Sequence, residues 1–230
     1  MINTFICVFG CKDTNYLPFD HLPFTIFFHF PHFCIFHFTF SIIAVPFSPF
    51  FCIFADEMMI TKQITASNAD EQIRQLYETA FPEEEQIPWD DLMHLIGEMH
   101  LDFTAYYDGD IFVGFTIIYP RPSFSWYWYF AVREELRGKG YGQQILSDVI
   151  QRYKGQTSVF DMESPRQECA NIEQRKRRHA FYLRNGFRDT NVYRRFDAVE
   201  MTIMMMGEGT FTIDDWNTLT NELRQHWTWN

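Results

Sequence analysis

The sequence predicts an α/β protein built on a mixed, mostly antiparallel sheet with flanking helices. Three observations support this prediction. From residue 59 onward, a strand and two helices precede a meander of three strands. One strand, a glycine-rich turn and a helix then form a crossover in the middle of the chain. Two adjacent strand-like segments and an amphipathic helix close the sequence, and no internal repeat is visible.

The first part of this region predicts six elements. Apolar and polar residues alternate from Met59 to Thr65, as in a half-buried strand. Apolar residues recur at helical intervals in Asp70–Phe81, and Asn68 with Glu71 has the spacing of a capping box at its start. The remaining predicted features are an acidic loop over 82–91, a helix over 90–99, a hairpin with its turn at 108–110 and its second strand at 111–119, and a strand over 123–132.

The second part predicts the crossover, a closing hairpin and a last helix. The turn Arg137–Gly142 separates the strand that ends at Val132 from a helix that ends near Lys154. Gly186 stands where a glycine commonly ends a helix. The other predicted elements are a strand over 157–164, a basic helix over 171–186, two antiparallel strands over 187–196 and 198–207, and an extra C-terminal helix near 213–227.

Residues 1–57 differ in composition from the rest of the chain. They hold 15 of the 26 Phe and four of the five Cys, and no Asp, Glu, Lys or Arg occurs from His21 to Ala55. We expect them to be a Phe-rich low-complexity leader outside the fold. Residues 58–230, with 18 Lys and Arg against 26 Asp and Glu and hence a net charge of -8, are expected to form one acidic domain.

The leader has three other interpretations. Its uncharged length would suffice for a membrane anchor, which is the main alternative, but four prolines and three histidines interrupt the stretch. It lacks the basic start, compact apolar core and small-residue cleavage site of a secretory signal. The close pair Cys7 and Cys11 is not followed by a second such pair, as a zinc site would require.

The turn Arg137–Gly142 has the properties of an anion-binding loop. Its glycines allow the main chain to approach a ligand closely, and the unpaired amides at the start of the next helix favour an anion. Arg137 and Lys139 add positive charge. The sequence matches neither a Walker loop nor a dinucleotide fingerprint, because Gln143 follows Gly142 and the strand order is not a repeated βαβ. We therefore expect a phosphate or pyrophosphate ligand of another class.

Two stretches resemble signatures of the GNAT N-acetyltransferase superfamily. "VREELRGKGYGQQIL" resembles its acyl-CoA-binding segment, whose pattern Arg/Gln-x-x-Gly-x-Gly/Ala is filled by Arg137, Gly140 and Gly142. Further along, "AFYLRNGF" resembles the second signature, with Tyr182 four residues before the glycine, and "FDMESP" between them looks like the fifth strand. The resemblance covers about residues 59–205. It implies a GNAT-like fold, in which the sheet is splayed between strands 4 and 5.

The resemblance implies that acetyl-CoA is the co-substrate. Its pyrophosphate would rest on the main-chain amides of the loop, and its pantetheine would pair with the backbone like an added strand. The implied cofactor-binding residues are Ala131, Val132, Arg137, Gly138, Lys139, Gly140, Tyr141 and Gly142. Many members carry Asn seven residues before the tyrosine, where this chain has Arg175, so contacts from the basic helix stay open.

The resemblance also implies direct attack of an amine on the thioester in a ternary complex. Tyr182 is then the predicted general acid for the leaving thiolate, since a phenol of pKa about 10 suits that role. Its alternative is a packed residue under the helix. Glu163 is the candidate base, directly or through water, and its alternative is a solvated surface residue. Tyr127 and Tyr129 line the acceptor site or belong to the core.

Charge and composition limit the partners. A net charge of -11 and a pI of about 5.1 argue against a nucleic-acid binder. The acceptor is a small-molecule amine or a protein amine, and the acidic run Glu83–Glu85 weakly favours a cationic one. The basic cluster 175–178 is a solvated helix face or an attraction for the 3′-phosphate of CoA. We expect a cytoplasmic protein with no metal and no membrane association, and a homodimer is conceivable. The alternative function is a non-catalytic acyl-CoA-binding sensor.

Overall fold

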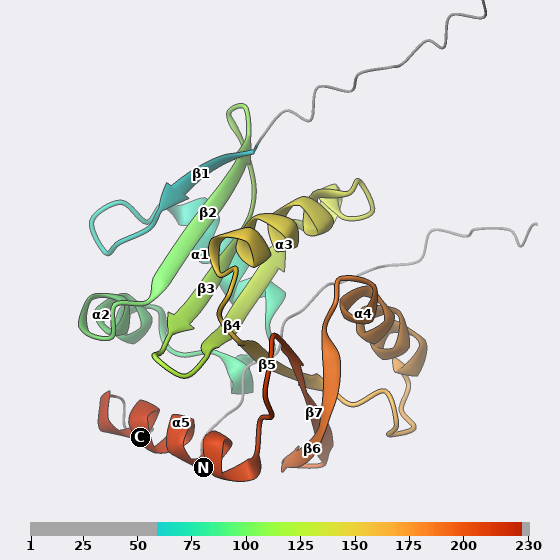
Figure 1. Ribbon diagram of the computed structural model, residues 1–230. Helices are drawn as coiled ribbons and strands as arrows, with labels where there is room; N and C mark the ends of the chain where they lie inside the picture. The colour runs from blue at the N-terminus through green and yellow to red at the C-terminus, as the bar shows by residue number, and fades with distance from the viewer. Residues whose placement is uncertain (1–58, 227–230) are drawn as a thin grey trace, which may run out of the picture. The chain divides into compact units, whose positions relative to one another are not determined.

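The computed structural model describes residues 59–226, and the predicted α/β fold is confirmed there (Figure 1). The predictions about the leader lie outside the described residues. The strands are β1 Ile60–Gln63, β2 Asp102–Asp108, β3 Ile111–Pro120, β4 Ser125–Val132, β5 Ser158–Glu163, β6 Arg188–Phe196 and β7 Val199–Met206. The helices are α1 Glu71–Ala80, α2 Trp89–Glu98, α3 Tyr141–Arg152, α4 Ile172–Arg184 and α5 Ile213–His226, with short 3-10 turns η1 Glu83–Glu85 and η2 Glu134–Leu136.

All seven strands form one sheet in the order β1-β2-β3-β4-β5-β7-β6. Neighbouring strands run antiparallel except β4 and β5, which are parallel because α3 carries the chain across the sheet between them. The closing hairpin inserts β7 beside β5 and leaves β6 at the edge. This arrangement splits the sheet into a β1–β4 part and a β5–β7 part, joined through β4 and β5.

The parallel pair is short, and the two strands then separate. Only Ser125 with Ser158 and Trp126 with Val159 are in register, although β4 continues for six residues beyond Trp126. The register between β3 and β4 also shifts between Ile117 and Ile118, which indicates a bulge on β4 near its middle. The predicted splay between strands 4 and 5 is therefore confirmed.

Two apolar clusters lie on opposite faces of the sheet. One packs α1, α2 and α5 against the sheet, and Ile73, Leu92 and Leu219 are among its buried members. The other packs α3 and α4 against the opposite face, with Ile145 and Tyr182 inside it. In Figure 1, α1 lies behind the sheet and α3 in front of it, whereas α4 is seen beside β6 and β7. The helices α3 and α4 thus flank the place where β4 and β5 separate.

The structure corrects two details of the sequence interpretation. The first strand is exposed along its whole length, because β1 is an edge strand that pairs only with β2. The helix cap is Asp70, whose Oδ1 accepts a hydrogen bond from the amide of Ile73 at 3.1 Å. Asn68 instead accepts one from the amide of Thr65 in the preceding turn. Asp and Asn are comparable caps, so the sequence pattern alone could not choose between them.

Candidate functional site

The glycine-rich turn forms the start of α3. Gly140 is the N-cap residue and adopts the left-handed conformation, with φ 90°, and Gly138 has φ 76°. Both conformations are strained for residues with a Cβ, which explains why glycine occupies both positions. A Cβ built on either residue would meet no atom within 4 Å, so the surface of the turn is open. The turn therefore presents main chain rather than side chains at the positive end of the α3 dipole.

The end of β4 exposes backbone on the side of the gap. Arg133 donates its amide to the carbonyl of Val113 on β3 at 2.9 Å. Alternate residues of a strand direct their backbone groups to opposite sides, so Ala131 also faces β3 and Val132 faces the gap. Consistently, the carbonyl oxygen of Val132 accepts a hydrogen bond from Nε of Arg137 at 3.0 Å. Of the two predicted pairing positions, Val132 is the one that the sheet directs toward β5.

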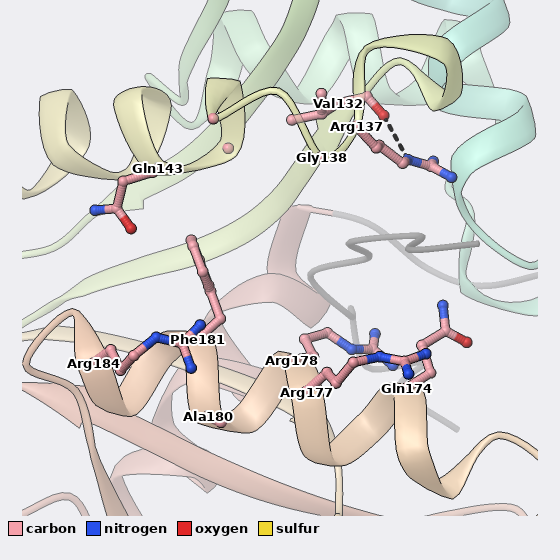
Figure 2. Close-up of a pocket in the computed structure, with 12 residues that line it drawn as sticks. Val132, Arg137, Gly138, Gln143, Gln174, Arg177, Arg178, Ala180, Phe181 and Arg184 are labelled. Atoms are coloured by element: carbon pink, nitrogen blue, oxygen red, sulfur yellow. Dashed lines mark hydrogen bonds between the residues drawn. The ribbon is translucent and has the colours of Figure 1, made fainter. Parts of the chain in front are cut away.

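A hollow of about 410 Å³ lies between this turn and α4 (Figure 2). Four arginines and no acidic residue line it, and Phe181 projects from α4 toward the turn. The full lining is Val132, Arg137, Gly138, Gly140, Gly142, Gln143, Gln174, Arg177, Arg178, Ala180, Phe181 and Arg184. The combination of open glycine backbone, a helix N-terminus and several guanidinium groups fits a ligand with several negative charges.

The structure brings together most, but not all, of the predicted cofactor residues. Val132, Arg137, Gly138, Gly140 and Gly142 line the hollow. Three predicted residues are not among its lining: Ala131, Lys139 and Tyr141. The hydroxyl of Tyr141 donates a hydrogen bond to Asp108 at the β2–β3 turn instead.

The contribution of α4 was left open by the sequence. The lining residues from this helix lie at positions 174, 177, 178, 180, 181 and 184, which share one face of the helix. The basic stretch "RKRR" was the available signal, and two of its members line the hollow. Its other arginine, Arg175, is buried away from the hollow, so composition alone could not assign each member.

Tyr182 lies in the apolar layer between α4 and the sheet. Its side chain is 1% exposed, and its ring centroid is 4.3 Å from that of Phe160 on β5. It also packs edge-on against Phe187. Tyr182 is not among the residues that line the hollow, whereas its neighbour Phe181 is. Its role as a general acid stays a prediction.

Glu163 ends β5 and is held by two arginines of α4. Its Oε1 is 2.6 Å from Nη2 of Arg175, and its Oε2 is 2.6 Å from Nη2 of Arg178. The arginine side chains are 6% and 3% exposed, and that of Glu163 is 16% exposed. This Glu163–Arg clamp ties the end of β5 to α4. Its role as a base stays a prediction.

A second hollow, of about 380 Å³, adjoins the clamp. It lies between the end of α1 with η1 and the start of α4, and Glu85 and Glu163 are the acidic residues in its lining. Gln174 and Arg178 line both this hollow and the first. The two hollows therefore meet at these two side chains, beside the gap in the sheet.

The tyrosines of β4 belong to the core. Tyr129 is 1% exposed, and its hydroxyl donates to the carbonyl of Glu85 at 2.9 Å. Burial raises the pKa of Tyr129 well above its usual value. Tyr127 accepts a hydrogen bond from the hydroxyl of Ser158 at 2.9 Å. Tyr129 thus fixes η1 against β4, at the edge of the second hollow.

The comparison with family models identifies the family to which the chain belongs. The model of the acetyltransferase (GNAT) family matches residues 70–187, which include α1, the glycine turn and α4. The chain belongs to the acetyltransferase (GNAT) family. No curated protein matches the sequence. In this GNAT protein, the first hollow lies where the family signatures of the sequence converge.

Solved structures share the fold. An acetyltransferase of the GNAT family from Bacteroides thetaiotaomicron superposes with a TM-score of 0.60 at 24% identity, over 72% of this chain and 96% of that chain. The ribosomal-protein-S18-alanine N-acetyltransferase from Escherichia coli gives 0.50 at 16% identity, over 67% and 100%. Ard1 from Thermoplasma volcanium gives 0.51 at 17% identity, over 66% and 99%. At these identities the likeness concerns the fold.

The described part of the chain contains neither a membrane-crossing helix nor a metal-binding cluster. Between residues 59 and 226, no helix combines the length and apolar character needed to cross a membrane. Over the same range, no group of three or more His, Cys, Asp or Glu residues is arranged to hold a metal ion. Cys169, the cysteine of this range, is a free thiol of intermediate exposure.

Proposed function

We propose that this GNAT protein transfers the acetyl group of acetyl-CoA to a primary amine, within a ternary complex. Family membership supports acetyl transfer in general. The observation that supports the proposal most directly is the first hollow, in which open glycine backbone faces four arginines and no acidic residue. Acetyl-CoA supplies the activated acetyl group, and the protein supplies the positions of the two reactants.

The first hollow has the groups that this co-substrate requires. We assign the pyrophosphate to the amides at the start of α3, together with Gly138 and Gly140, because their surface is open and they lie at the positive end of the helix dipole. We assign the pantetheine to the backbone of Val132, which faces the gap in the sheet. Arg177 and Arg184, on the α4 wall of the hollow, are suited to the 3′-phosphate. The sheet leaves this space because β4 and β5 pair over only two positions.

The second hollow is the proposed acceptor side. It meets the first at Gln174 and Arg178, so an amine there would reach the end of the pantetheine. Each oxygen of Glu163 already contacts a guanidinium, so we assign it an action on the amine through water rather than by direct contact. Tyr182 is assigned the protonation of the leaving thiolate. The acceptor is a small amine or a protein amine.

One observation favours a second candidate function. Tyr182 is 1% exposed and does not line the first hollow, as expected of a packed residue rather than an acid. A non-catalytic acyl-CoA-binding sensor would keep the loop and lack turnover. Slow or absent acetyl transfer to every amine, together with tight binding of acetyl-CoA, would favour this candidate.

The first test is a calorimetric titration of acetyl-CoA into the full chain beside a Gly140→Glu variant. We expect saturable binding that the variant loses by about a hundredfold or more, because a charged side chain would occupy the pyrophosphate position. A Gly140→Ala variant is the matched control: it carries the backbone strain of a Cβ at φ 90° without the negative charge. Equal loss in both variants would assign the effect to strain. Absence of binding to the wild-type chain would refute the proposal.

A further inference from the structure

A third hollow, of about 410 Å³, lies between the edge strand β6 and α5, apart from the two hollows described above. Its lining comes from two segments, 194–195 of β6 and 216–224 of α5, and includes no residue that lines the first or second hollow. The lining residues are Arg194, Arg195, Trp216, Asn217, Thr220, Asn221 and Arg224. The family match ends at residue 187, so every one of these residues lies beyond it.

The charge of this hollow is opposite to that of the domain. Three arginines and no carboxylate line it, whereas residues 58–230 carry 18 Lys and Arg against 26 Asp and Glu. The other lining groups are two amides, one hydroxyl and one indole, all of which can donate hydrogen bonds. A hollow lined by donors and positive charge is complementary to an oxyanion.

Arg194 is fixed in place before any ligand binds. Its side chain is 9% exposed, and it pairs with Asp161 of β5, which is completely buried. The indole of Trp216 packs on its guanidinium, with 4.6 Å between the Cζ atom and the ring centroid. The hydrogen bonds to Asp161 use Nε and Nη2 of Arg194, so Nη1 takes part in neither. A preorganised guanidinium of this kind loses little entropy when it binds an anion.

The opposite wall of the hollow is one face of α5. Asn217, Asn221 and Arg224 follow at helical spacing and are exposed. Nη1 of Arg224 donates a hydrogen bond to Oδ1 of Asn221 at 3.1 Å, which holds the guanidinium at the hollow. Arg195, next to Arg194 on β6, is exposed. Arg195 and Arg224 therefore supply positive charge that, unlike that of Arg194, has no ion pair among the described residues.

We propose that the hollow between β6 and α5 is an anion site, at which Arg194, Arg195 and Arg224 bind a phosphate or carboxylate group. The group belongs either to a free anion or to an amine acceptor that carries one. Both sources share the same chemistry at the site. Arg194 connects the site through Asp161 to β5, and Glu163 at the end of that strand lines the second hollow.

The test is a titration of the full chain with inorganic phosphate at constant ionic strength, followed by tryptophan fluorescence. The chain has six Trp, so the difference between the wild type and a Trp216→Phe variant isolates the signal at the site. We expect saturation in the wild type. Arg224→Gln and Arg195→Gln should each weaken binding about tenfold, since each variant removes a charge-assisted hydrogen bond to the anion. Arg194 is left intact because its loss would strand Asp161 in the core.

Two controls make the result specific. Arg74→Gln removes an exposed arginine of α1 that pairs with Glu78, and it should leave phosphate binding unchanged. Gly140→Glu blocks the first hollow, which also attracts phosphate, and the Trp216 signal should persist in that variant. A signal that does not saturate, or that is the same in Arg195→Gln and Arg224→Gln as in the wild type, would refute the site.

A second arm separates the two sources and rests on the proposed function. Acetylation rates are compared for ethanolamine and phosphoethanolamine, with and without free phosphate. An acceptor anchor predicts a preference for the phosphorylated amine and competition by phosphate. A free-anion site predicts that phosphate changes both rates or neither. Failure of acetyl transfer to both amines would refute the acceptor anchor for this class of amine and leave the fluorescence result standing.

Discussion

The two sides of β4 show how this protein combines a stable sheet with an open site. On one side, β4 pairs with β3 along its length, from Ser125 to Val132, with a single register shift. On the other side, β4 pairs with β5 at only two positions and then separates from it. On the β3 side, the backbone amides and carbonyls of β4 are used in strand pairing. On the β5 side, those beyond Trp126 can pair with another extended chain. The candidate site lies where regular pairing stops.

Different interactions hold the two sides. The strands β3 and β4 pair with their backbones close together at Gly114, where a side chain would not fit. Across the gap, side chains replace the missing strand pairing, and the Glu163–Arg clamp joins the end of β5 to α4. Substitutions on the closed side should therefore damage the fold, whereas those on the open side should affect the clamp or the chemistry.

The largest effect is expected from Gly114→Ala on the closed side. A Cβ at this position would lie 2.2 Å from the carbonyl oxygen of Ala131, and backbone cannot yield as a flexible side chain can. We expect a loss of about 4 kcal/mol or more in the free energy of unfolding, measured by urea denaturation. Gly97→Ala is the control, because nothing lies within 4 Å of its added Cβ in α2, and it should be neutral or stabilising by about 0.5 kcal/mol.

Glu163→Gln should cost about 3 kcal/mol in the same measurement. The variant leaves two buried guanidinium groups without their carboxylate, which is the expensive way to break a buried ion pair. Glu173→Gln removes an exposed partner of Lys176 and should change the stability by less than about 0.5 kcal/mol. Similar small effects in both variants would show that the clamp does not hold β5 to α4.

Tyr182→Phe should lower kcat about a hundredfold and leave the affinity for acetyl-CoA unchanged. The variant keeps the ring contacts with Phe160 and Phe187 and removes only the hydroxyl. Phe160→Leu is a control for packing, since it should reduce stability more than catalysis. Unchanged kcat in Tyr182→Phe would assign the tyrosine to the core.

The last prediction concerns the pH dependence of stability. Burial raises the pKa of Asp161 from about 3.8 to about 7. The charge of Arg194 lowers this pKa, but its effect is smaller than that of burial. The folded state then binds the proton more tightly than the unfolded state, so this group stabilises the fold fully below about pH 4. That contribution is lost as the pH rises through about 7. We expect the wild type to lose stability relative to Asp161→Asn between about pH 4 and pH 8, measured by urea denaturation at each pH. A constant difference across this range would contradict the shift.

The sequence predicted features that depend on neighbouring residues better than features that depend on residues far apart in the chain. The α1 helix, the β2–β3 hairpin and the turn before α3 were predicted because periodicity, turn residues and glycines act within a few positions. The exposure of β1 was missed, because its position at the sheet edge depends on which strands pair. The burial of Arg175 and Arg178 was also missed, since a run of arginines predicts solvent exposure unless a carboxylate is folded against it.

Local sequence patterns specify the elements, their order and the glycine turn of this member of the acetyltransferase (GNAT) family. Each of these follows from local backbone preferences and from patterns of a few residues. Three features became visible only in the folded chain: Val132 rather than Ala131 faces the gap, Glu163 lies between two arginines, and β6 and α5 enclose a cationic hollow. These features depend on strand register and on contacts between residues far apart in the chain, which no local pattern encodes.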